Sequence, residues 1–412
     1  MKKQLLLTIS LCVSMALGGC AFPLETSEST GAGTDLSENS TVSSVTSSGK
    51  NSAESSLESS TVTSSESATD SVEESSKESF EDSSTSEEDS STSEEDSSVE
   101  TVVYDDLSVH FLQLGNKTSG DCTLIKVGDT EVLIDAGSTD GSAKTIVPYI
   151  SQYCTDGKLE YVIATHGDAD HISAFVGTST SKGVFESFEC GTIIDFAQTT
   201  KTTQVYNNYV RLREAEVEAG AQHYTALQCW NNADGAQRSY ALGKDITLNI
   251  LYQKYYEQKT SNENNYSVCT LITQGDNNFL FTGDLEESGE KSLVESNDLP
   301  QCVLYKAGHH GSNTSSTQAL ISVIQPEIVV ANCCCGDKYN FPHQEFINTI
   351  APYTQRVYIP VMTTANGYAL LNGNIVVSST QDGVSVNCSN NNTLFKDTDW
   401  FKANRVTPDA WK

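Results

Sequence analysis

The chain has 412 residues, of which 55 are acidic and 24 basic, and its formal net charge is −31 at pH 7. Domains that hold nucleic acid by its phosphates usually show a basic surface, so this composition excludes binding through a broadly basic face. With 37% hydrophobic residues, the sequence can still supply the core of one large folded domain.

The first twenty residues predict export. Two lysines precede an apolar run from Leu5 to Leu17, which is too short to span a bilayer. The run ends in Leu17-Gly18-Gly19-Cys20, the pattern of a bacterial lipobox. We therefore expect residues 1–19 to be a signal peptide, and lipid on Cys20 to anchor the protein outside the cell, on a Gram-positive-type surface. The alternative is an ordinary cleaved signal in which Cys20 is incidental.

Residues 20–100 are dominated by Ser, Thr and Glu. Residues 21–100 contain 20 acidic residues and two lysines, and the segment Ser83–Asp89 is repeated without change over Ser90–Asp96. Such a segment buries too little apolar surface to offset the entropy of ordering, so it is predicted to be a disordered, self-repelling stalk. A direct binding role for the repeat is the alternative. Residues 101–412 keep a net charge of −15.

Residues 101–388 are predicted to form the folded domain, followed by a C-terminal tail over residues 389–412. Short β-rich runs alternate there with turns and helical segments. Strands are expected at 109–114, 122–127, 131–134, 159–164, 192–196, 246–252, 267–273, 278–281, 302–305, 328–331, 357–359, 368–371 and 375–378. Helices are expected at 143–153, 205–218, 316–324 and 343–350. This order fits two sheets with outer helices, and it also fits an unrelated α/β fold.

Ten cysteines follow Cys20. Export permits disulfides, but their pairing does not follow from sequence. Cys122, Cys269 and Cys302 lie in apolar strand segments and are expected to be small core residues. The run Cys333-Cys334-Cys335 lacks the spacing of a zinc knuckle.

The segment Tyr161–His171, YVIATHGDADH, carries the chemistry. A buried strand is expected to end at Ala164, and strand ends are where sheets present functional groups. Two imidazoles and two carboxylates follow within six residues: His166, Asp168, Asp170 and His171. Imidazole with carboxylate suits Zn, Mn or Fe. A compact turn would direct His166 and Asp168 to one metal, and Asp170 and His171 to another. A solvated loop with a helix N-cap explains one Asp but not all four residues.

With these motifs the sequence resembles the metallo-β-lactamase superfamily, whose signature is HxHxDH after a strand. The likeness includes Asp135 in LIDAG, Asp284 in FLFTGD and the pair His309-His310 in KAGHHGS. It is similar to the nuclease-type domain of the competence DNA-uptake protein ComEC, a branch that also has Asp at the position of Asp168. The resemblance covers about residues 109–386. It implies an α/β (α+β) four-layer αββα sandwich, the metallo-β-lactamase fold, preceded here by the stalk.

The resemblance also implies roles for individual residues. His166 and Asp168 would bind one of two divalent ions, Zn or Mn; Asp170 and His171 would bind the other, and Asp284 would bridge them. His310 would complete the second site, with His309 beside it as a catalytic or substrate-contacting group, although sequence leaves open which of the two is the ligand. Asp135 would orient the site from behind the ligands, and Asp170 would also direct the attacking water. Candidate substrate contacts are Lys306, Ser312 and His343.

Two departures from the pattern stand out. The Gly-Gln-Gly-Asp start typical of ComEC is lengthened here to Gly115–Asp121. Where the relatives read Tyr-Gly-His-Pro-His, this chain reads Tyr339-Asn340-Phe341-Pro342-His343, so Phe341 replaces a His expected to face the site. Trp400, Phe401 and Trp411 lie in the tail beyond the resemblance and are expected to pack on the domain rather than on a ligand.

Together these observations favour an extracellular metal-dependent hydrolase, specifically a phosphodiesterase or nuclease. The alternatives are an esterase for wall polymers, such as phosphorylcholine on teichoic acid, a lactone or lactam hydrolase, and a non-catalytic surface binding module. The expected partners are a phosphodiester substrate, either DNA or wall polymer, and the membrane through the lipid on Cys20 alone. No protein partner is inferred.

Overall fold

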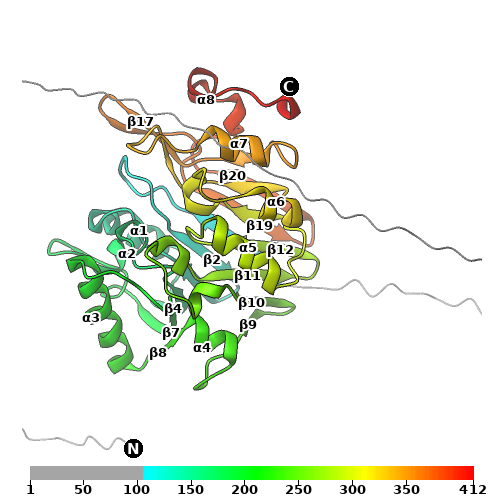
Figure 1. Ribbon diagram of the computed structural model, residues 1–412. Coiled ribbons are helices and arrows are strands. Elements are labelled where there is room, and N and C mark those ends of the chain that lie inside the picture. Colours follow the sequence, from blue (N-terminus) through cyan, green and yellow to red (C-terminus); the bar gives the residue numbers. More distant parts are fainter. Residues whose placement is uncertain (1–104) are drawn as a thin grey trace, which may run out of the picture. The chain divides into compact units, whose positions relative to one another are not determined.

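The structure is a computed structural model that describes residues 105–412. The predicted signal peptide, Cys20 and the stalk lie outside the described residues. Within them, two large sheets are stacked face to face and helices cover both outer surfaces (Figure 1). This four-layer αββα arrangement confirms the predicted fold class. None of the helices in residues 105–412 is long and apolar enough to cross a bilayer.

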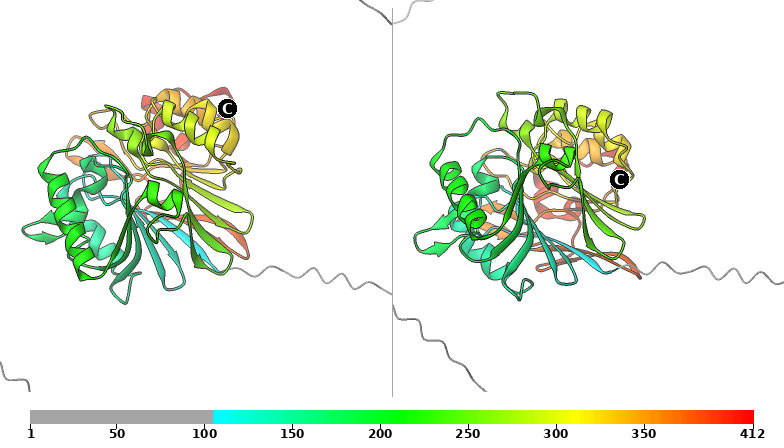
Figure 2. Two further views of the ribbon diagram at one scale, coloured as in Figure 1. Left: turned by 60° about the horizontal axis from the view of Figure 1, so that its bottom comes forward. Right: turned by 90° about the horizontal axis from the view of Figure 1, so that it is seen from below.

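The first sheet has eight strands in the order β20-β19-β1-β2-β3-β4-β7-β8. Its members are β1 (Leu107–Phe111), β2 (Thr123–Val127), β3 (Thr130–Ile134), β4 (Lys158–Ile163), β7 (Glu189–Asp195), β8 (Gln222–Thr225), β19 (Ile375–Thr380) and β20 (Gly383–Cys388). Strands β3, β4, β7 and β8 run parallel, so their carboxyl ends share one edge. Helices α1 (Ala143–Ile150), α2 (Ala169–Val176) and α3 (Gln204–Ala219) lie on the outer side of this sheet (Figure 2).

The second sheet has seven strands in the order β16-β14-β13-β12-β11-β10-β9. They are β9 (Ser239–Gly243), β10 (Ile246–Leu251), β11 (Cys269–Gln274), β12 (Asn277–Phe281), β13 (Leu304–Lys306), β14 (Ile328–Val330) and β16 (Val357–Tyr358). Strands β12, β13, β14 and β16 are parallel, and their carboxyl ends again meet at one edge. Helices α5 (Glu287–Ser296), α6 (Gln318–Ile324) and α7 (Gln344–Ile350) cover the outer face.

Smaller elements complete the described part of the chain. A three-stranded sheet contains β15 (Cys334–Cys335), β17 (Val361–Thr364) and β18 (Gly367–Leu370), and a two-stranded ribbon contains β5 (Gly177–Thr178) and β6 (Ser181–Lys182). Two short helices are α4 (Ala226–Asn231) and α8 (Asp399–Asn404). Single turns of 3-10 helix fall at Asp140–Ser142, Lys254–Tyr256, Glu263–Tyr266, Gly308–Gly311, Phe395–Asp397 and Asp409–Trp411.

The core lies between the sheets and beneath their outer helices. Phe111 of β1 and Phe281 of β12 meet across the two inner faces, with ring centroids 6.4 Å apart. Phe175 on α2 and Tyr209 on α3 are fully buried outside the first sheet, with centroids 5.8 Å apart. Burial of such aromatic side chains contributes about 1.5–3 kcal/mol each, so both sides of the sheet are stabilised.

Most predicted strands and helices coincide with observed ones, with small shifts at their ends. The segment expected to be a compact turn is different, because α2 begins inside it at Ala169. Asp168 takes the extended conformation of an N-cap, and Ile172 and Phe175 supply the buried helix face. Helix α5 was not predicted, since few of its residues are apolar. Leu293 is the one apolar side chain among its buried positions.

The predicted tail packs on the domain. Phe395, Phe401 and Trp411 are buried, and the Trp411 indole donates to Thr354 O at 2.9 Å. The three cysteines expected in the core are buried, and none of the ten cysteines within residues 105–412 is in a disulfide.

Candidate metal centre

The candidate site lies at the shared edge of both sheets, where the parallel strands end. Strand β4 leads into His166, and β3 leads into Asp135. From the second sheet, β12 leads into Asp284, and β13 leads into His309 and His310. The carboxyl ends of parallel strands are the usual position of functional groups in α/β proteins. The fold therefore brings together side chains that are more than 100 residues apart in sequence.

Three buried imidazoles lie in the site, and each has a neighbour at its Nδ1 atom. His171 Nδ1 donates to Asp135 Oδ2 at 2.8 Å, and His310 Nδ1 donates to Asn332 O at 2.9 Å. His166 Nδ1 lies 3.2 Å from the Thr165 hydroxyl. The Nε2 atoms of the three rings are buried and have no hydrogen-bond partner within residues 105–412.

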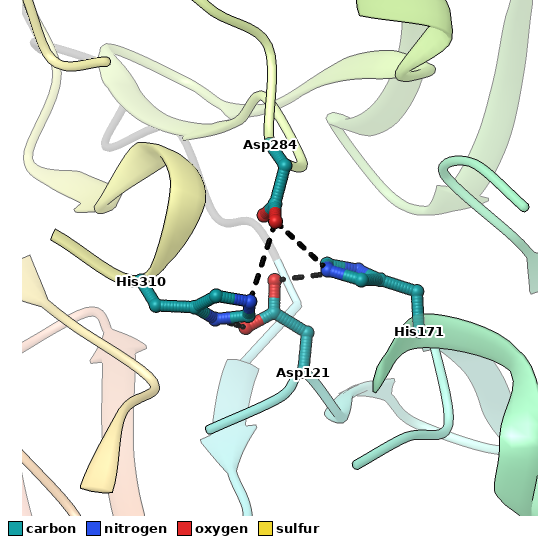
Figure 3. A group of neighbouring side chains, drawn as sticks. All are labelled: Asp121, His171, Asp284 and His310. Carbon is teal, nitrogen blue, oxygen red and sulfur yellow. Dashed lines mark ion pairs between the residues drawn. The ribbon is translucent and has the colours of Figure 1, made fainter. Parts of the chain in front are cut away.

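The three Nε2 atoms face carboxylate oxygens. Asp284 Oδ2 lies 3.1 Å from His171 Nε2 and 3.3 Å from His310 Nε2 (Figure 3). His166 Nε2 lies 3.5 Å from Asp168 Oδ2, and the His166 and His171 rings are 4.1 Å apart. Imidazole held through Nδ1, with Nε2 free to face a carboxylate, is the donor arrangement of a divalent-metal site. The residues present therefore fit such ions.

The electrostatics agree with this arrangement. Burial lowers the pKa of His171 and of His310, but Asp284 and the neighbouring carboxylates outweigh burial and raise both pKa values well above the ordinary value. Burial raises the pKa of Asp284, yet His171 and His310 hold it well below its ordinary value. The cluster thus favours positive charge beside Asp284, which a metal ion can supply in place of protons.

Asp121 and Lys306 close the site from below. Asp121 Oδ1 lies 3.2 Å from His310 Nδ1, its Oδ2 is ion-paired with Lys306, and four ligand atoms from Asp121, His171, Asp284 and His310 lie within 4.8 Å of one another. Burial raises the pKa of Asp121, but Lys306 and His310 lower it to about 2. Sequence analysis placed Asp121 only at the end of the lengthened entry loop and assigned it no role in the site.

Lys306 does not have the position expected of a substrate contact. Its side chain is 3% exposed, donates to Gly283 O at 3.2 Å and lies 3.7 Å from Asp284 Oδ1. Lys306 therefore compensates buried carboxylates and does not line the pocket. We call the buried set the floor of the site; it consists of Asp121, Asp135, His171, Asp284, Lys306 and His310.

Asp168 and Asp170 lie on the open side of the floor. Asp170, in the first turn of α2, has its Oδ2 3.5 Å from His310 Nε2. Burial raises the Asp170 pKa, but the neighbouring imidazoles of His310 and His171 lower it overall. Asp168 precedes the helix and pairs with both His166 and Lys201. Asp168 and Asp170 thus border the pocket described below, whereas His166 and His171 are fully buried.

His309 and His310 have separate directions, although they are adjacent in sequence. Both have left-handed backbone conformations, with φ values of 47° and 57°. Such conformations cost about 1–2 kcal/mol per non-glycine residue and tend to occur at functional sites. Here they turn His310 into the floor and His309 toward the pocket. His309 Nδ1 lies 3.0 Å from the Thr314 hydroxyl, and its Nε2 lies 3.8 Å from Asp284 Oδ2.

A hollow of about 350 Å³ opens above the floor. Its lining comes from both sheets and comprises Asp168, Asp170, Asn264, Asp284, His309, His310, Ser312, Tyr339, Phe341 and His343. Phe341, the residue that replaces an expected His, is 4% exposed, and its ring centroid is 5.8 Å from those of both His309 and His310. It gives this wall an apolar face. We call this wall of the pocket the mouth; it consists of His309, Tyr339 and Phe341.

The two other expected substrate contacts border the pocket but already have partners. His343 Nδ1 accepts from the Asn313 amide at 3.0 Å, and its Nε2 donates to Tyr339 O at 2.9 Å. His343 therefore ties the Tyr339 loop to the segment after His310. The Ser312 hydroxyl lies 3.0 Å from that of Thr314.

The floor rests on an interlocked backbone. The Asp121 amide donates to Asp170 O at 3.1 Å, and the Gly137 amide donates to Asp121 O at 2.9 Å. A Cβ atom at Gly137 would lie 1.9 Å from Asp170 O, so no side chain fits there. The start of β2, the end of β3 and the start of α2 are therefore fixed relative to one another.

Comparison with known proteins agrees with this geometry. The profile of the Metallo-beta-lactamase superfamily matches residues 115–177, which include the HGDADH segment. Among solved structures, the metallo-beta-lactamase fold protein YhfI from Bacillus subtilis covers 63% of this chain and 97% of its own length, with 11% identity and a TM-score of 0.39. Residues 115–177 thus match a metallo-β-lactamase superfamily domain.

The chain is also similar to part of several curated competence and recombination proteins. Competence protein ComA of Neisseria gonorrhoeae is 26% identical over 56% of this chain and 28% of its own length. Recombination protein 2 of Haemophilus influenzae is 29% identical over 58% of this chain and 26% of its own length. ComE operon protein 3 of Bacillus subtilis is 23% identical over 54% of this chain and 26% of its own length. The aligned part of this chain thus spans about a quarter of the length of these relatives.

Proposed function

We propose that this chain is a metal-dependent phosphodiesterase that binds two divalent ions. The observation that carries the proposal is a set of three buried Nε2 atoms without hydrogen-bond partners, two of which face Asp284 and the third Asp168. His166 and Asp168 would hold one ion. Asp170, His171 and His310 would hold the other, and Asp284 would be shared. When bound, such ions make hydroxide available near neutral pH and neutralise charge that develops on a phosphoryl oxygen.

Two residues of the pocket have chemical roles in this proposal. Asp170 is held ionised by His310 and His171, so it can accept a hydrogen bond from the attacking water and orient it. Burial is the largest influence on His309 and lowers its pKa, so its ring is neutral at pH 7 and its Nε2 faces the pocket. The neutral ring of His309 can therefore donate a hydrogen bond from Nε2 to the substrate.

We further propose a nucleic-acid strand as the substrate. The names of the curated relatives, which refer to competence and recombination, support this choice. The acidic composition of residues 101–412 means that the ions and the cationic side chain of Lys201 must attract the phosphates locally. A wall-polymer phosphodiester is the second candidate, because lipid on Cys20 would hold the enzyme outside the cell. Cys20 lies outside the described residues, so this location remains a prediction.

The test is hydrolysis of bis-p-nitrophenyl phosphate by the full chain after loading with Zn²⁺ or Mn²⁺, with metal content measured by elemental analysis. Asp170→Ala is expected to lower turnover by at least about 100-fold, in the range of lost general-base catalysis. Asp129→Ala removes an exposed carboxylate from the turn between β2 and β3 and serves as the matched control. DNA and teichoic acid fragments are then compared at equal phosphodiester concentration.

Three outcomes would count against all or part of the proposal. Absence of bound metal in the wild-type chain would overturn the metal centre itself. Bound metal without phosphodiester turnover would overturn the phosphodiesterase and favour a lactone substrate or a binding role. Preference for teichoic acid over DNA would overturn only the choice of substrate.

A further inference from the structure

Lys201 contacts a carboxylate of the site from the loop between β7 and α3. Its ammonium group is ion-paired with Asp168 Oδ1, and both side chains are partly exposed, at 24% and 28%. The other carboxylate oxygen, Asp168 Oδ2, lies 3.5 Å from His166 Nε2. The two oxygens of Asp168 therefore have different neighbours. Oδ1 faces Lys201, and Oδ2 faces His166.

A buried carboxylate holds the loop that carries Lys201. Glu263 is 5% exposed, and its Oε1 accepts a hydrogen bond from Thr199 Oγ1 at 2.5 Å. Its Oε2 accepts from the Thr200 amide at 2.8 Å and from the Thr200 hydroxyl at 2.7 Å. The Lys201 amide then donates to Thr199 Oγ1 at 3.0 Å. Because burying a carboxylate is costly unless donors surround it, these bonds fix the loop in one position.

The loop also presses on the metal-binding segment. A Cβ atom at Gly167 would lie 2.8 Å from Glu263 Oε1 and 3.0 Å from both Lys201 Cγ and Thr199 Oγ1. Residue 167 separates His166 from Asp168, so glycine lets the loop approach the backbone between these two candidate ligands. The approach of the loop is thus built into the turn and does not depend on the flexible end of the lysine alone.

Each of the three imidazoles has a partner that fixes its orientation, namely Asp135, Asn332 O or Thr165. We propose that Lys201 does the same for Asp168: it is a positioning residue that holds Oδ1 and leaves Oδ2 as the single ligand atom for the ion beside His166. This inference rests on the metal centre of the proposed function. It adds a residue, Lys201, and its buried support, Glu263, to the parts that determine how one of the two ions is bound.

A rival explanation predicts the opposite change in metal affinity when Lys201 is removed. If Lys201 acted only as a counter-ion that competes with metal for Asp168, its removal would tighten binding of the ion. If Lys201 positions Asp168, its removal frees the carboxylate to rotate and to offer both oxygens, and binding becomes weaker. Loss of an outer partner of a ligand typically costs about 10–100-fold in metal affinity.

The experiment is a Co²⁺ and Zn²⁺ titration of the full chain against a chromophoric chelator, with wild type compared with Lys201→Met. Lys182→Met, which removes an exposed lysine on β6, is the control. One of the two ions is expected to bind at least about tenfold more weakly to Lys201→Met. The visible absorption of bound Co²⁺ should also weaken, because a second carboxylate oxygen raises its coordination number.

Glu263→Gln is a second variant, which leaves Lys201 in place and loosens the loop. It should change the affinity for the same ion and the Co²⁺ spectrum in the same direction, by a smaller factor. Wild-type affinity and an unchanged spectrum in Lys201→Met, or tighter binding, would overturn the positioning role while the metal centre stands. Absence of metal from the wild-type chain would instead overturn the proposed function, and this inference with it.

Discussion

The floor and the mouth of the site are built in different ways. Floor residues are buried, and each contacts at least one other charged or polar floor group, as in the pairs His171–Asp135 and Lys306–Asp121. Mouth residues come from separate loops and are unevenly exposed; Tyr339 is 53% exposed, whereas Phe341 is 4% exposed. In the proposed function, the floor would therefore contribute most of the ligands for the ions, and the mouth would affect which substrates reach them.

This difference separates two kinds of mutational effect. A change in the floor leaves a buried charge or a polar atom without its partner, which costs stability and metal affinity together. A change at the mouth leaves no buried charge without its partner. It should therefore alter substrate affinity with little effect on folding. The following predictions test that separation, from the largest expected effect to the smallest.

Asp284→Asn should have the largest effect, because this carboxylate is the common neighbour of the floor imidazoles. We expect turnover to fall below detection and metal affinity to fall by more than about 100-fold. Loss of even an outer partner of a ligand lowers metal affinity by about 10–100-fold, and Asp284 is proposed as a ligand itself. Equilibrium dialysis and elemental analysis measure the loss. Metal retained at wild-type stoichiometry and affinity would show that Asp284 is not a metal ligand.

Lys306→Met should destabilise the metal-free protein by about 3–5 kcal/mol, because Asp121 and Asp284 would then be buried without their cation. Urea unfolding in the presence of a chelator measures this cost. The double variant Asp121→Asn with Lys306→Met should recover part of it, since one buried charge is removed as well. If the single variant unfolds at the wild-type urea concentration, the pair does not support the floor.

His110 gives the contrasting case of a buried imidazole whose ring nitrogens both have partners. They lie 2.9 Å from the hydroxyl groups of Tyr149 and Ser108, and burial, with a smaller contribution from Lys126, lowers the pKa from 6.5 to about 4. Below pH 6.5 His110 is protonated in the unfolded chain, whereas in the folded chain it stays neutral until the pH falls to about 4. His110 therefore stabilises the fold fully above pH 6.5, and up to about 3 kcal/mol is lost as the pH falls toward 4.

The measurement is the free energy of unfolding of wild type and His110→Gln at several pH values between 7 and 4. The difference between the two proteins should shrink as the pH falls, because the glutamine does not titrate. Parallel curves would show that His110 does not titrate differently in the folded and unfolded states.

Tyr339→Ala should have the smallest effect on the protein itself. The side chain is largely exposed and lies under Lys338, whose ammonium group is 4.5 Å from the ring centroid. We expect the free energy of unfolding to change by less than about 0.5 kcal/mol and metal content to stay the same. KM for the phosphodiester should rise several-fold with kcat nearly unchanged. A loss of metal in this variant would contradict the separation between mouth and floor.

Sequence identified the parts of the site that are contiguous. His166 to His171 were recognised because four candidate ligands fall within six residues after an apolar strand. The local conformation was only partly predicted, because the start of α2 depends on burial of Ile172 and Phe175 against the rest of the fold. Two sheets with outer helices were also predicted, because alternating strands and helices leave a pattern along the chain.

The remaining parts could not be predicted, because they depend on contacts between distant segments. Asp121 reaches the floor from the start of β2, and Lys306 reaches it from the end of β13, 185 residues later. The Gly120-Asp121 pair after the entry loop was the available signal, and it indicated a changed loop instead of a buried acid. Lys201 and Glu263 carry no motif, and only the folded chain shows that they meet beside Asp168.

The interlocked backbone at Gly137 has a consequence for how new activities can arise on this scaffold. The floor is attached to strand ends and to the start of α2, whereas Tyr339 and Phe341 belong to the loop between β15 and α7. Libraries that vary residues 336–341 would therefore change one wall of the pocket while the backbone that carries the floor stays the same.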